Sequence, residues 1–390
     1  MGKWEIIKLN ELSLRMHQGI NTVADKVEYQ ISGIPIIQSK NITQGNLDLE
    51  DVRYVNYENY EKYRSKYNPC IGDVLVSNIG TIGKSLVISK ENSFLIAWNV
   101  FLISLKKEKM FPKYFNYFMN YLYLTNYYEK LLTGGTVKFI NKKKMGDIEI
   151  PLPPIDVQKK IAQILDVASE LIALRKKQLA ELDNLIKSTF YDMFGDPVVN
   201  EKGWEVNRLG EKCNIITGNT PPRADKDNYG TFIEWIKSDN INTNAIYLTF
   251  AEEYLSEKGF KLCRYVDEPS VLMTCIAGSI KCIGNVAIAN RKVSFNQQIN
   301  AIVPKKNNVY YIYTLFLLTQ QYIQSTINMS LKGILSKGKL TELKFIFPPI
   351  DLQNKFAQIV TKIEEQKALV QKALDESQYL FDSLMSEYFE

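Results

Sequence analysis

The sequence contains one internal duplication, and this feature constrains its fold more than any other. Residues 153–165 read PPIDVQKKIAQIL and residues 348–360 read PPIDLQNKFAQIV, with nine of 13 positions identical. Scattered matches extend over the preceding residues, where the pattern Ile-x-Ser-x-Asn-Ile at 37–42 returns at 236–241. The chain therefore consists of two related units, about 4–194 and 204–389.

Similarity between the two units is uneven. The tails that begin at Pro153 and Pro348 match closely, whereas the bodies in front of them share only scattered positions. This pattern indicates that the two tails perform the same task, while the two bodies have diverged to bind different things.

Each tail has the apolar periodicity of one long helix. Asp156 and Asp351 are expected to cap the two helices, and Gly195 is expected to end the first one. A helix of about 38 residues is about 57 Å long, so it cannot be buried in one body and needs a partner of similar length. We expect the tails to pair through these apolar residues: Leu165, Ile172, Leu179, Ile186, Ile363, Val370, Leu374 and Phe381.

Polar residues interrupt both apolar stripes. Arg175 lies within the first stripe, and Gln366 and Lys367 lie within the second. Two interpretations stay open at this point, because such residues either mark the docking site of another protein or are tolerated by local packing.

Both bodies combine short strands with one helix rich in aromatic residues. Helical spacing predicts helices at 112–132 and 309–327, each followed by a loop rich in Gly and Lys. Alternating and β-branched stretches predict strands at the following positions: 34–37, 73–77, 85–88, 97–105, 147–151, 232–237, 271–276, 285–289, 298–303 and 343–347.

The predicted fold class is α+β. Two globular domains of mixed helix and strand, 1–152 and 196–347, are each followed by one long helix, 153–195 and 348–390. The two helices are expected to form an antiparallel coiled coil. The two halves of the internal duplication would then be related by a pseudo-twofold axis.

The residues that common catalytic and metal sites require are scarce. The five cysteines include no Cys-x-x-Cys pair, so no metal site is predicted, and the single histidine, His17, is expected to be structural. No methyltransferase, helicase or nuclease motif is found, so no catalytic residue is predicted. The apolar stretches are too short to span a bilayer and the start has no signal core, which predicts a cytoplasmic protein.

The segment from Gly80 to Ser85 ends in Gly-Lys-Ser, like a phosphate-binding loop. That motif needs a glycine at the position of Asn78, and a strand rather than a helix follows the segment. A nucleotide-binding enzyme centred here is therefore a disfavoured alternative. We expect a turn between two strands that presents N–H groups and a cation to a ligand, as does its counterpart 277–281.

The aromatic segment from Phe111 to Tyr128 has two interpretations. It could form a platform on which bases stack, or it could pack against a sheet. The helical spacing of Tyr114, Phe115 and Phe118 favours packing in the core.

Basic and amide side chains gather near the predicted loops. Lysines there either lie on a solvated face or contact phosphates, and Asn and Gln can pair with adenine. The net charge of +5 is compatible with nucleic acid without requiring it. The candidate DNA-binding residues are Lys40, Asn41, Asn78, Thr81, Lys84, Asn99, Lys138, Lys142, Lys143, Asp239, Asn240, Ser279, Lys281, Asn296, Gln297, Gln298 and Lys332.

Taken together, the landmarks resemble those of the specificity subunit of type I restriction–modification enzymes. They are Gly-Trp-Glu-Val at 203–206, Pro-Leu-Pro-Pro-Ile-Asp-Val-Gln at 151–158 and Phe-Gly-Asp-Pro at 194–197, and the resemblance covers essentially the whole chain. The family often has Glu where Asp156 and Asp351 stand, and Asp keeps the charge.

The resemblance implies that each body is a target-recognition domain that reads one half of a split, asymmetric site in double-stranded DNA. It also implies that the helices set the gap between the half-sites and bind two methyltransferase subunits, which a restriction subunit can join. S-adenosylmethionine, Mg and ATP are then expected on the partner subunits, with no cofactor on this chain and no catalysis by it. The alternative is a coiled-coil scaffold that joins two protein-binding modules without nucleic acid.

Overall fold

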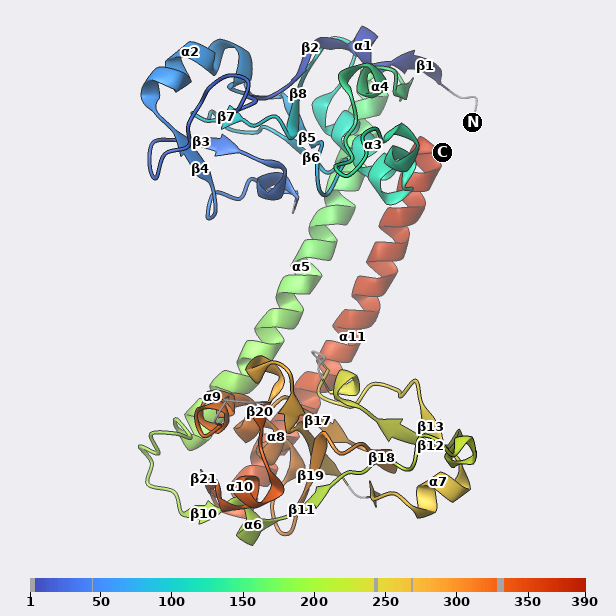
Figure 1. Ribbon diagram of the computed structural model, residues 1–390. Helices are drawn as coiled ribbons and strands as arrows, with labels where there is room; N and C mark the ends of the chain where they lie inside the picture. Colours follow the sequence, from blue (N-terminus) through green and yellow to red (C-terminus); the bar gives the residue numbers. More distant parts are fainter. Residues whose placement is uncertain (1–3, 44, 242–244, 268, 328–332) are drawn as a thin grey trace. The chain divides into compact units, whose positions relative to one another are not determined.

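The computed structural model describes residues 4–43, 45–241, 245–267, 269–327 and 333–390. The chain divides into two compact units, of which unit 1 comprises 1–175 with 373–390 and unit 2 comprises 176–372. Helix α5 (Ile155–Phe194) and helix α11 (Ile350–Phe389) each contribute one half to either unit. Figure 1 labels the elements of both units, which form an α+β fold.

Among its described residues, the body of unit 1 carries three small sheets, whose strands are labelled in Figure 1. Its strands are β1 (Glu5–Lys8), β2 (Ser13–Gln18), β3 (Ile34–Ile37), β4 (Arg53–Val55), β5 (Val74–Ser77), β6 (Ser85–Val87), β7 (Leu95–Ile96), β8 (Val100–Leu105) and β9 (Glu149–Leu152). Its helices besides the long ones are α1 (Leu9–Leu12), η1 (Ser39–Ile42), α2 (Tyr57–Tyr67), α3 (Pro112–Leu124), η2 (Tyr127–Leu131) and α4 (Lys142–Gly146).

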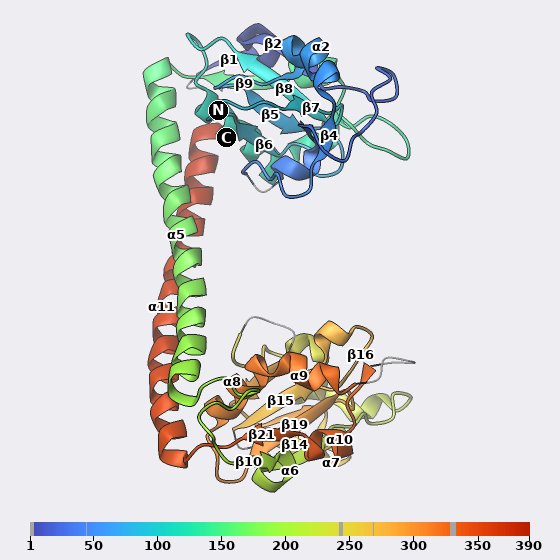
Figure 2. The same ribbon diagram turned by 90° about the vertical axis from the view of Figure 1, so that its left-hand side faces the viewer.

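Strand order in unit 1 brings distant segments together. The largest sheet has the antiparallel order β2-β8-β5-β6, seen in Figure 2, and β1 pairs with β9 in a separate ladder. A further sheet has the order β4-β3-β7, in which β3 and β7 are parallel. Because parallel strands end at the same edge, the residues after β3 and after β7 lie close together.

Unit 2 has its own set of strands and helices. Its strands are β10 (Val206–Arg208), β11 (Cys213–Thr217), β12 (Tyr229–Ile236), β13 (Tyr254–Leu255), β14 (Tyr265–Val266), β15 (Ser270–Thr274), β16 (Ile276–Ala277), β17 (Val286–Ala289), β18 (Val293–Phe295), β19 (Ile299–Pro304), β20 (Gly333–Ile334) and β21 (Lys344–Ile346). Its shorter helices are α6 (Leu209–Lys212), η3 (Lys226–Asn228), η4 (Ser238–Asn240), α7 (Glu257–Lys261), η5 (Ile280–Cys282), α8 (Val309–Leu318), α9 (Gln320–Ser325) and α10 (Lys337–Glu342).

The strand order of unit 1 recurs in unit 2. The antiparallel sheet β11-β19-β15-β17 corresponds to β2-β8-β5-β6, and β12 pairs in parallel with β18 as β3 does with β7. The ladder β10–β21 corresponds to β1–β9. The duplication therefore includes the bodies, although their sequences have diverged.

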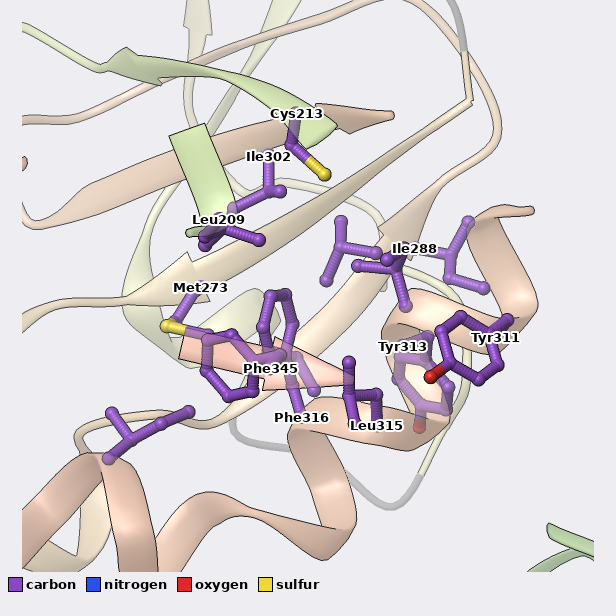
Figure 3. Packing of buried hydrophobic residues seen from close by; sticks show 14 of the residues in the cluster. Leu209, Cys213, Met273, Ile288, Ile302, Tyr311, Tyr313, Leu315, Phe316 and Phe345 are labelled. Atoms are coloured by element: carbon purple, nitrogen blue, oxygen red, sulfur yellow. The ribbon is translucent and has the colours of Figure 1, made fainter. Parts of the chain in front are cut away.

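One face of the large sheet in unit 2 packs against α8. Met273 and Ile302 of the sheet lie with Leu315 and Phe316 of this helix in one apolar cluster, shown in Figure 3. In unit 1, Phe115 and Phe118 of α3 are buried in the equivalent cluster. The prediction that the aromatic segment packs in the core is confirmed.

The halves of the long helices pair antiparallel within each unit. In unit 1, Leu165 of α5 lies in the same apolar cluster as Met385 and Phe389 of α11. In unit 2, Ile186 of α5 shares a cluster with Ile363 of α11. Of the other residues predicted to pair, Ile172 and Leu374 are buried, while Phe381, Leu179 and Val370 are partly buried.

The two charged interruptions of the stripes bind across the helix pair. In unit 1 the guanidinium of Arg175 donates to the hydroxyl of Ser377. In unit 2 the ammonium of Lys367 lies 2.6 Å from Asp183 and 2.8 Å from Glu364. The exposed Gln366 makes no such contact among the described residues.

Several boundaries differ from the predictions. Each long helix begins one residue before its aspartate, so Asp156 and Asp351 lie inside the first turn instead of capping it, where their charge still favours the helix N-terminus. The helix at Pro112 ends at Leu124, because Asn126 takes a left-handed conformation with φ 56°. The strand predicted from residue 97 begins at Val100.

The segment from Gly80 to Ser85 connects β5 to β6, as predicted, and no helix follows it. Gly80 and Gly83 have φ of 81° and 92°, which explains glycine at both positions of this turn. Within the described part of the chain, no helix is long and apolar enough to cross a membrane.

Candidate nucleic-acid interface

Most of the predicted binding residues of unit 1 gather at the edge where β3 and β7 end. Ser39 and Lys40 follow β3, and Asn99 lies between β7 and β8. The N–H of Ser39 donates to Oδ1 of Asn99 over 3.4 Å, and its hydroxyl donates 2.5 Å to the Asn99 carbonyl. These bonds hold the two loops side by side.

Asn78 joins two further loops to this edge. Its N–H donates to the Asn99 carbonyl over 2.8 Å, and its Oδ1 accepts the N–H of Ile140 over 2.9 Å. The loop that carries Thr81 and the loop that carries Lys138 therefore meet at the same place. The side chain of Asn78 is fully buried, so it holds the loops together from the protein interior and does not face solvent.

Unit 2 builds the equivalent edge with one shared backbone bond and one that ends on a backbone carbonyl where unit 1 uses the side-chain oxygen of Asn78. The N–H of Cys275 donates to the Gln298 carbonyl over 2.8 Å, as Asn78 does to Asn99, and the N–H of Leu335 donates to the Cys275 carbonyl over 2.8 Å. Segments 97–99 and 296–298 are therefore structurally equivalent.

Asn41 and Asn240 shape this edge from inside. Oδ1 of Asn41 accepts the N–H of Gln38 over 3.0 Å, and Oδ1 of Asn240 accepts the N–H of Lys237 over 3.0 Å. Both amides also donate to neighbouring loops, and both side chains are buried. Their recurrence in the sequence follows from this local hydrogen bonding.

Four exposed lysines and the partly buried Lys84 lie on or next to the loops of this edge in unit 1. Lys40 pairs with Asp51 and hydrogen-bonds to it, which lowers the pKa of that carboxyl group. Lys84 lies 4.0 Å above the ring of Tyr123, and Lys138 is exposed on the Gly-rich loop. Lys142 and Lys143 are exposed on α4, which begins directly after this loop. Cations placed this way suit contacts to phosphate oxygens.

Unit 2 presents amides and an acid at its edge. Gln297 is exposed and its Oε1 accepts from the hydroxyl of Thr220, while Oε1 of Gln298 accepts from the buried Asn296 over 3.1 Å. Asp239 is exposed beside them. Ser279 and Lys281 are also exposed, after β16, and Lys332 falls outside the described residues.

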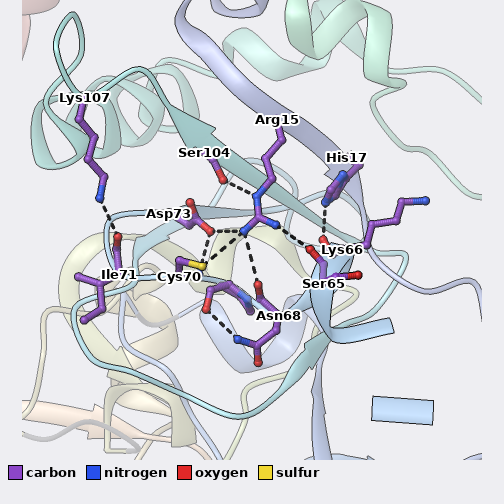
Figure 4. A network of polar contacts seen from close by, with 11 residues as sticks. Arg15, His17, Ser65, Lys66, Asn68, Cys70, Ile71, Asp73, Ser104 and Lys107 are labelled. Carbon is purple, nitrogen blue, oxygen red and sulfur yellow. Dashed lines mark hydrogen bonds and ion pairs between the residues drawn. The ribbon is translucent and has the colours of Figure 1, made fainter. Parts of the chain in front are cut away.

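His17 and Arg15 lie on β2, where they contact residues that precede β5 (Figure 4). Nε2–H of His17 donates to the Lys66 carbonyl over 2.7 Å, and Arg15 forms a half-buried ion pair with Asp73 at 2.8 Å. Burial, followed by the positive charges of Lys66, Arg15 and Lys142, lowers the pKa of His17 to about 4. The ring is therefore neutral at pH 7 and has the structural role that the sequence predicted.

Sequence reasoning missed two residues at these edges. The guanidinium of Arg223 lies 4.8 Å above the ring of Trp235 and 3.0 Å from Glu253. Trp98 lies between Ala97 and Asn99 with a partly exposed ring. No local pattern marks either residue, because their partners lie on distant segments. Among the described residues, no group of three or more His, Cys, Asp or Glu could hold a metal ion.

The chain is similar to known proteins over most of its length. A family model for the type I restriction modification DNA specificity domain matches residues 1–184 and 201–376. The type I restriction enzyme MjaX specificity subunit of Methanocaldococcus jannaschii is 25% identical over 389 residues, covering 93% of this chain and 87% of that protein. The MjaVIII specificity subunit of the same organism is 25% identical over 334 residues, with 77% and 76% covered.

Solved structures share the fold at low sequence identity. The S subunit of a type I restriction–modification system from M. genitalium superposes with a TM-score of 0.59 and 16% identity, covering 100% of this chain and 96% of that one. A chain from a structural study of type I R-M complex assembly gives a TM-score of 0.61 at 16% identity, with 100% and 98% covered.

Proposed function

The chain belongs to the family of type I restriction–modification DNA specificity domains, and from this premise we propose that it reads a bipartite, asymmetric site in double-stranded DNA. Each body reads one half-site with the edge described above. One observation carries the proposal: equivalent frameworks in the two units present different side chains. Lys40 corresponds to Asp239, and Asn99 corresponds to Gln298. Two recognition domains with the same backbone framework and different side chains select different half-sites.

The long helices, in this proposal, set the gap between the half-sites and bind two methyltransferase subunits. Each unit presents three exposed apolar side chains at matching repeat positions. They are Ile164, Leu174 and Leu380 in unit 1, and Ile359, Leu369 and Leu185 in unit 2. A surface that occurs twice suits one kind of partner bound twice, and exposed apolar groups on a helix favour a protein partner. Restriction subunits would join the same complex.

Catalysis is assigned to the partners. The methyltransferase subunits would bind S-adenosylmethionine and methylate one adenine in each half-site, and restriction subunits would use Mg and ATP. This chain would bind no cofactor and contribute no catalytic residue. A cytoplasmic location follows from this role, because the DNA and the partner subunits are there.

Salt-dependent DNA binding tests the proposal against a protein-binding scaffold. Contacts to several phosphates release counterions, so the affinity of the complex with its methyltransferase should fall steeply as salt rises from 50 to 200 mM, by roughly 10³-fold or more. Binding would be measured by fluorescence anisotropy on duplexes with and without the methylated motif. A complex that forms but binds no duplex at any salt concentration would support the scaffold instead.

A further inference from the structure

Trp98 and Gln297 occupy the same place in the two units. They are the central residues of segments 97–99 and 296–298, whose backbone bonds coincide. The two segments share these backbone bonds but none of their three residues, and at the centre an indole stands in one unit and a primary amide in the other. At a position with the same backbone and a different side chain, two related recognition domains can differ in the bases that they bind.

The indole N–H of Trp98 has no protein acceptor among the described residues. By contrast, Nε1–H of Trp204 donates to the Phe194 carbonyl over 2.7 Å, and Nε1–H of Trp235 donates to the Asn219 carbonyl over 3.3 Å. Trp98 is also only partly buried. Its donor is therefore free to bind an external acceptor, as tryptophan commonly does at interfaces.

A backbone hydrogen bond and an aromatic contact hold Trp98 in place. Its backbone N–H donates to the Ile20 carbonyl over 2.8 Å, and its ring lies 5.8 Å from that of Phe139 at an angle of 52°. Lys138 and Asn99 are its neighbours along the two adjoining loops. The position combines a flat apolar surface, one donor and an adjoining loop that carries the exposed Lys138.

Gln297 offers different chemistry at the equivalent place in unit 2. The hydroxyl of Thr220 donates to its Oε1, which orients the amide and leaves its N–H groups toward solvent. The second lone pair of Oε1 remains able to accept. This combination of one donor and one acceptor matches the major-groove edge of adenine.

We propose that Trp98 and Gln297 are equivalent base-contacting residues that make the two half-sites different. Gln297 pairs with an adenine in the half-site of unit 2. Trp98 places its ring against a thymine methyl group in the half-site of unit 1 and donates its indole N–H to a base acceptor. This inference rests on the proposed function and specifies which positions set the sequence that is read.

The test uses the chain co-expressed with its methyltransferase, with methylated motifs mapped across a genome. Trp98→Gln should reduce methylation of the native motif at least 10-fold or change a required base in the half-site of unit 1, and leave the other half-site unchanged. Trp98→Phe keeps an apolar ring without the donor and should show a smaller loss. Gln297→Ala should act on the other half-site alone, and Gln321→Ala, an exposed amide of α9, serves as its matched control.

The outcomes separate this inference from the proposed function. If the wild-type complex methylates no bipartite motif, the proposed function is wrong. If the wild-type complex methylates one, while Trp98→Gln and Gln297→Ala complexes of normal thermal stability methylate the same motif within twofold of the wild-type rate, the inference alone is overturned. Altered requirements in the expected half-sites support it.

Discussion

The side-chain oxygen of Gln158 accepts the backbone N–H of Phe111 over 2.8 Å, and this bond joins the first turn of α5 to the start of α3. The amide of Gln158 also donates to the carbonyls of Lys109 and Pro153, each over 2.8 Å, and its side chain is fully buried. One glutamine therefore satisfies three backbone groups where the body of unit 1 meets its long helix.

Gln353 repeats this arrangement in unit 2. Its Oε1 accepts the N–H of Asn308 over 2.9 Å, and its amide donates to the Pro348 carbonyl over 2.8 Å. The repeated glutamine of the Pro-Pro-Ile-Asp-x-Gln motif is thus a structural tie between body and helix, which explains its presence in both tails.

Gln158→Ala should lower the free energy of unfolding by about 2–4 kcal/mol, because it leaves buried backbone donors and acceptors without partners. Thermal unfolding followed by circular dichroism would measure the change. Gln163→Ala removes an exposed glutamine of the same helix and should change stability little. Equal melting temperatures for the two variants would contradict the structural role.

Lys367→Met should destabilise the helix pair of unit 2 by about 1–3 kcal/mol, because it leaves Asp183 and Glu364 without their cation. Burial alone would lower the pKa of Lys367, but its bonds to both carboxylates outweigh burial and hold the pKa above its usual value. The stabilisation is therefore present at neutral pH and is lost as pH rises through that raised pKa. Denaturant unfolding at pH 7.5 would detect the effect, with the exposed Lys372→Met as control.

Stability should fall as pH drops from about 6.5 toward 4, and His17 should account for part of the loss. Its pKa is lowered to about 4 in the folded state, so the unfolded chain binds more protons in this range. The contribution is about 1–2 kcal/mol after allowance for solvent screening. Melting temperatures at pH 7.5 and 5 should differ less in His17→Gln than in the wild type. An identical pH dependence in both proteins would rule out this assignment.

Leu174→Glu should reduce the number of bound methyltransferase subunits from two to one, because it places a charge in the exposed apolar set of unit 1 alone. Leu369→Glu should do the same through unit 2, and the double variant should bind none. Native mass spectrometry of the co-expressed complex would count the subunits. Ala173→Glu changes an exposed position next to Leu174 on another side of the helix and should retain two. Full occupancy in the double variant would show that docking occurs elsewhere.

The long helices were predictable from sequence because an uninterrupted apolar period leaves few alternatives. Their polar contacts were not, because Lys367 meets Asp183 only in one register of two segments far apart in the chain. The order of the strands could not be predicted from the sequence either, because pairs such as β2 with β8 join residues separated by other strands and depend on long-range packing.

The sequence predicted which loops form the candidate site better than it predicted which residues of those loops face a ligand. Sequence reasoning selected the loops that meet at each edge, because polar residues follow predicted strands there. It could not separate Asn41, whose amide is buried in a local turn, from Asn99 at the edge, because both are asparagines beside a strand. Trp98 was missed, because a tryptophan next to a buried strand is indistinguishable by pattern from a core residue.

The most direct measurement of the central claim is a map of methylated adenines in a methylation-free host that expresses this chain with its methyltransferase. The expected result is a split, asymmetric motif with one methylated adenine on each strand. Replacing residues 203–347 with the body of a related subunit should change one half of that motif and leave the other unchanged. A swap that alters both halves or neither, or a soluble complex that methylates no motif, would contradict the account.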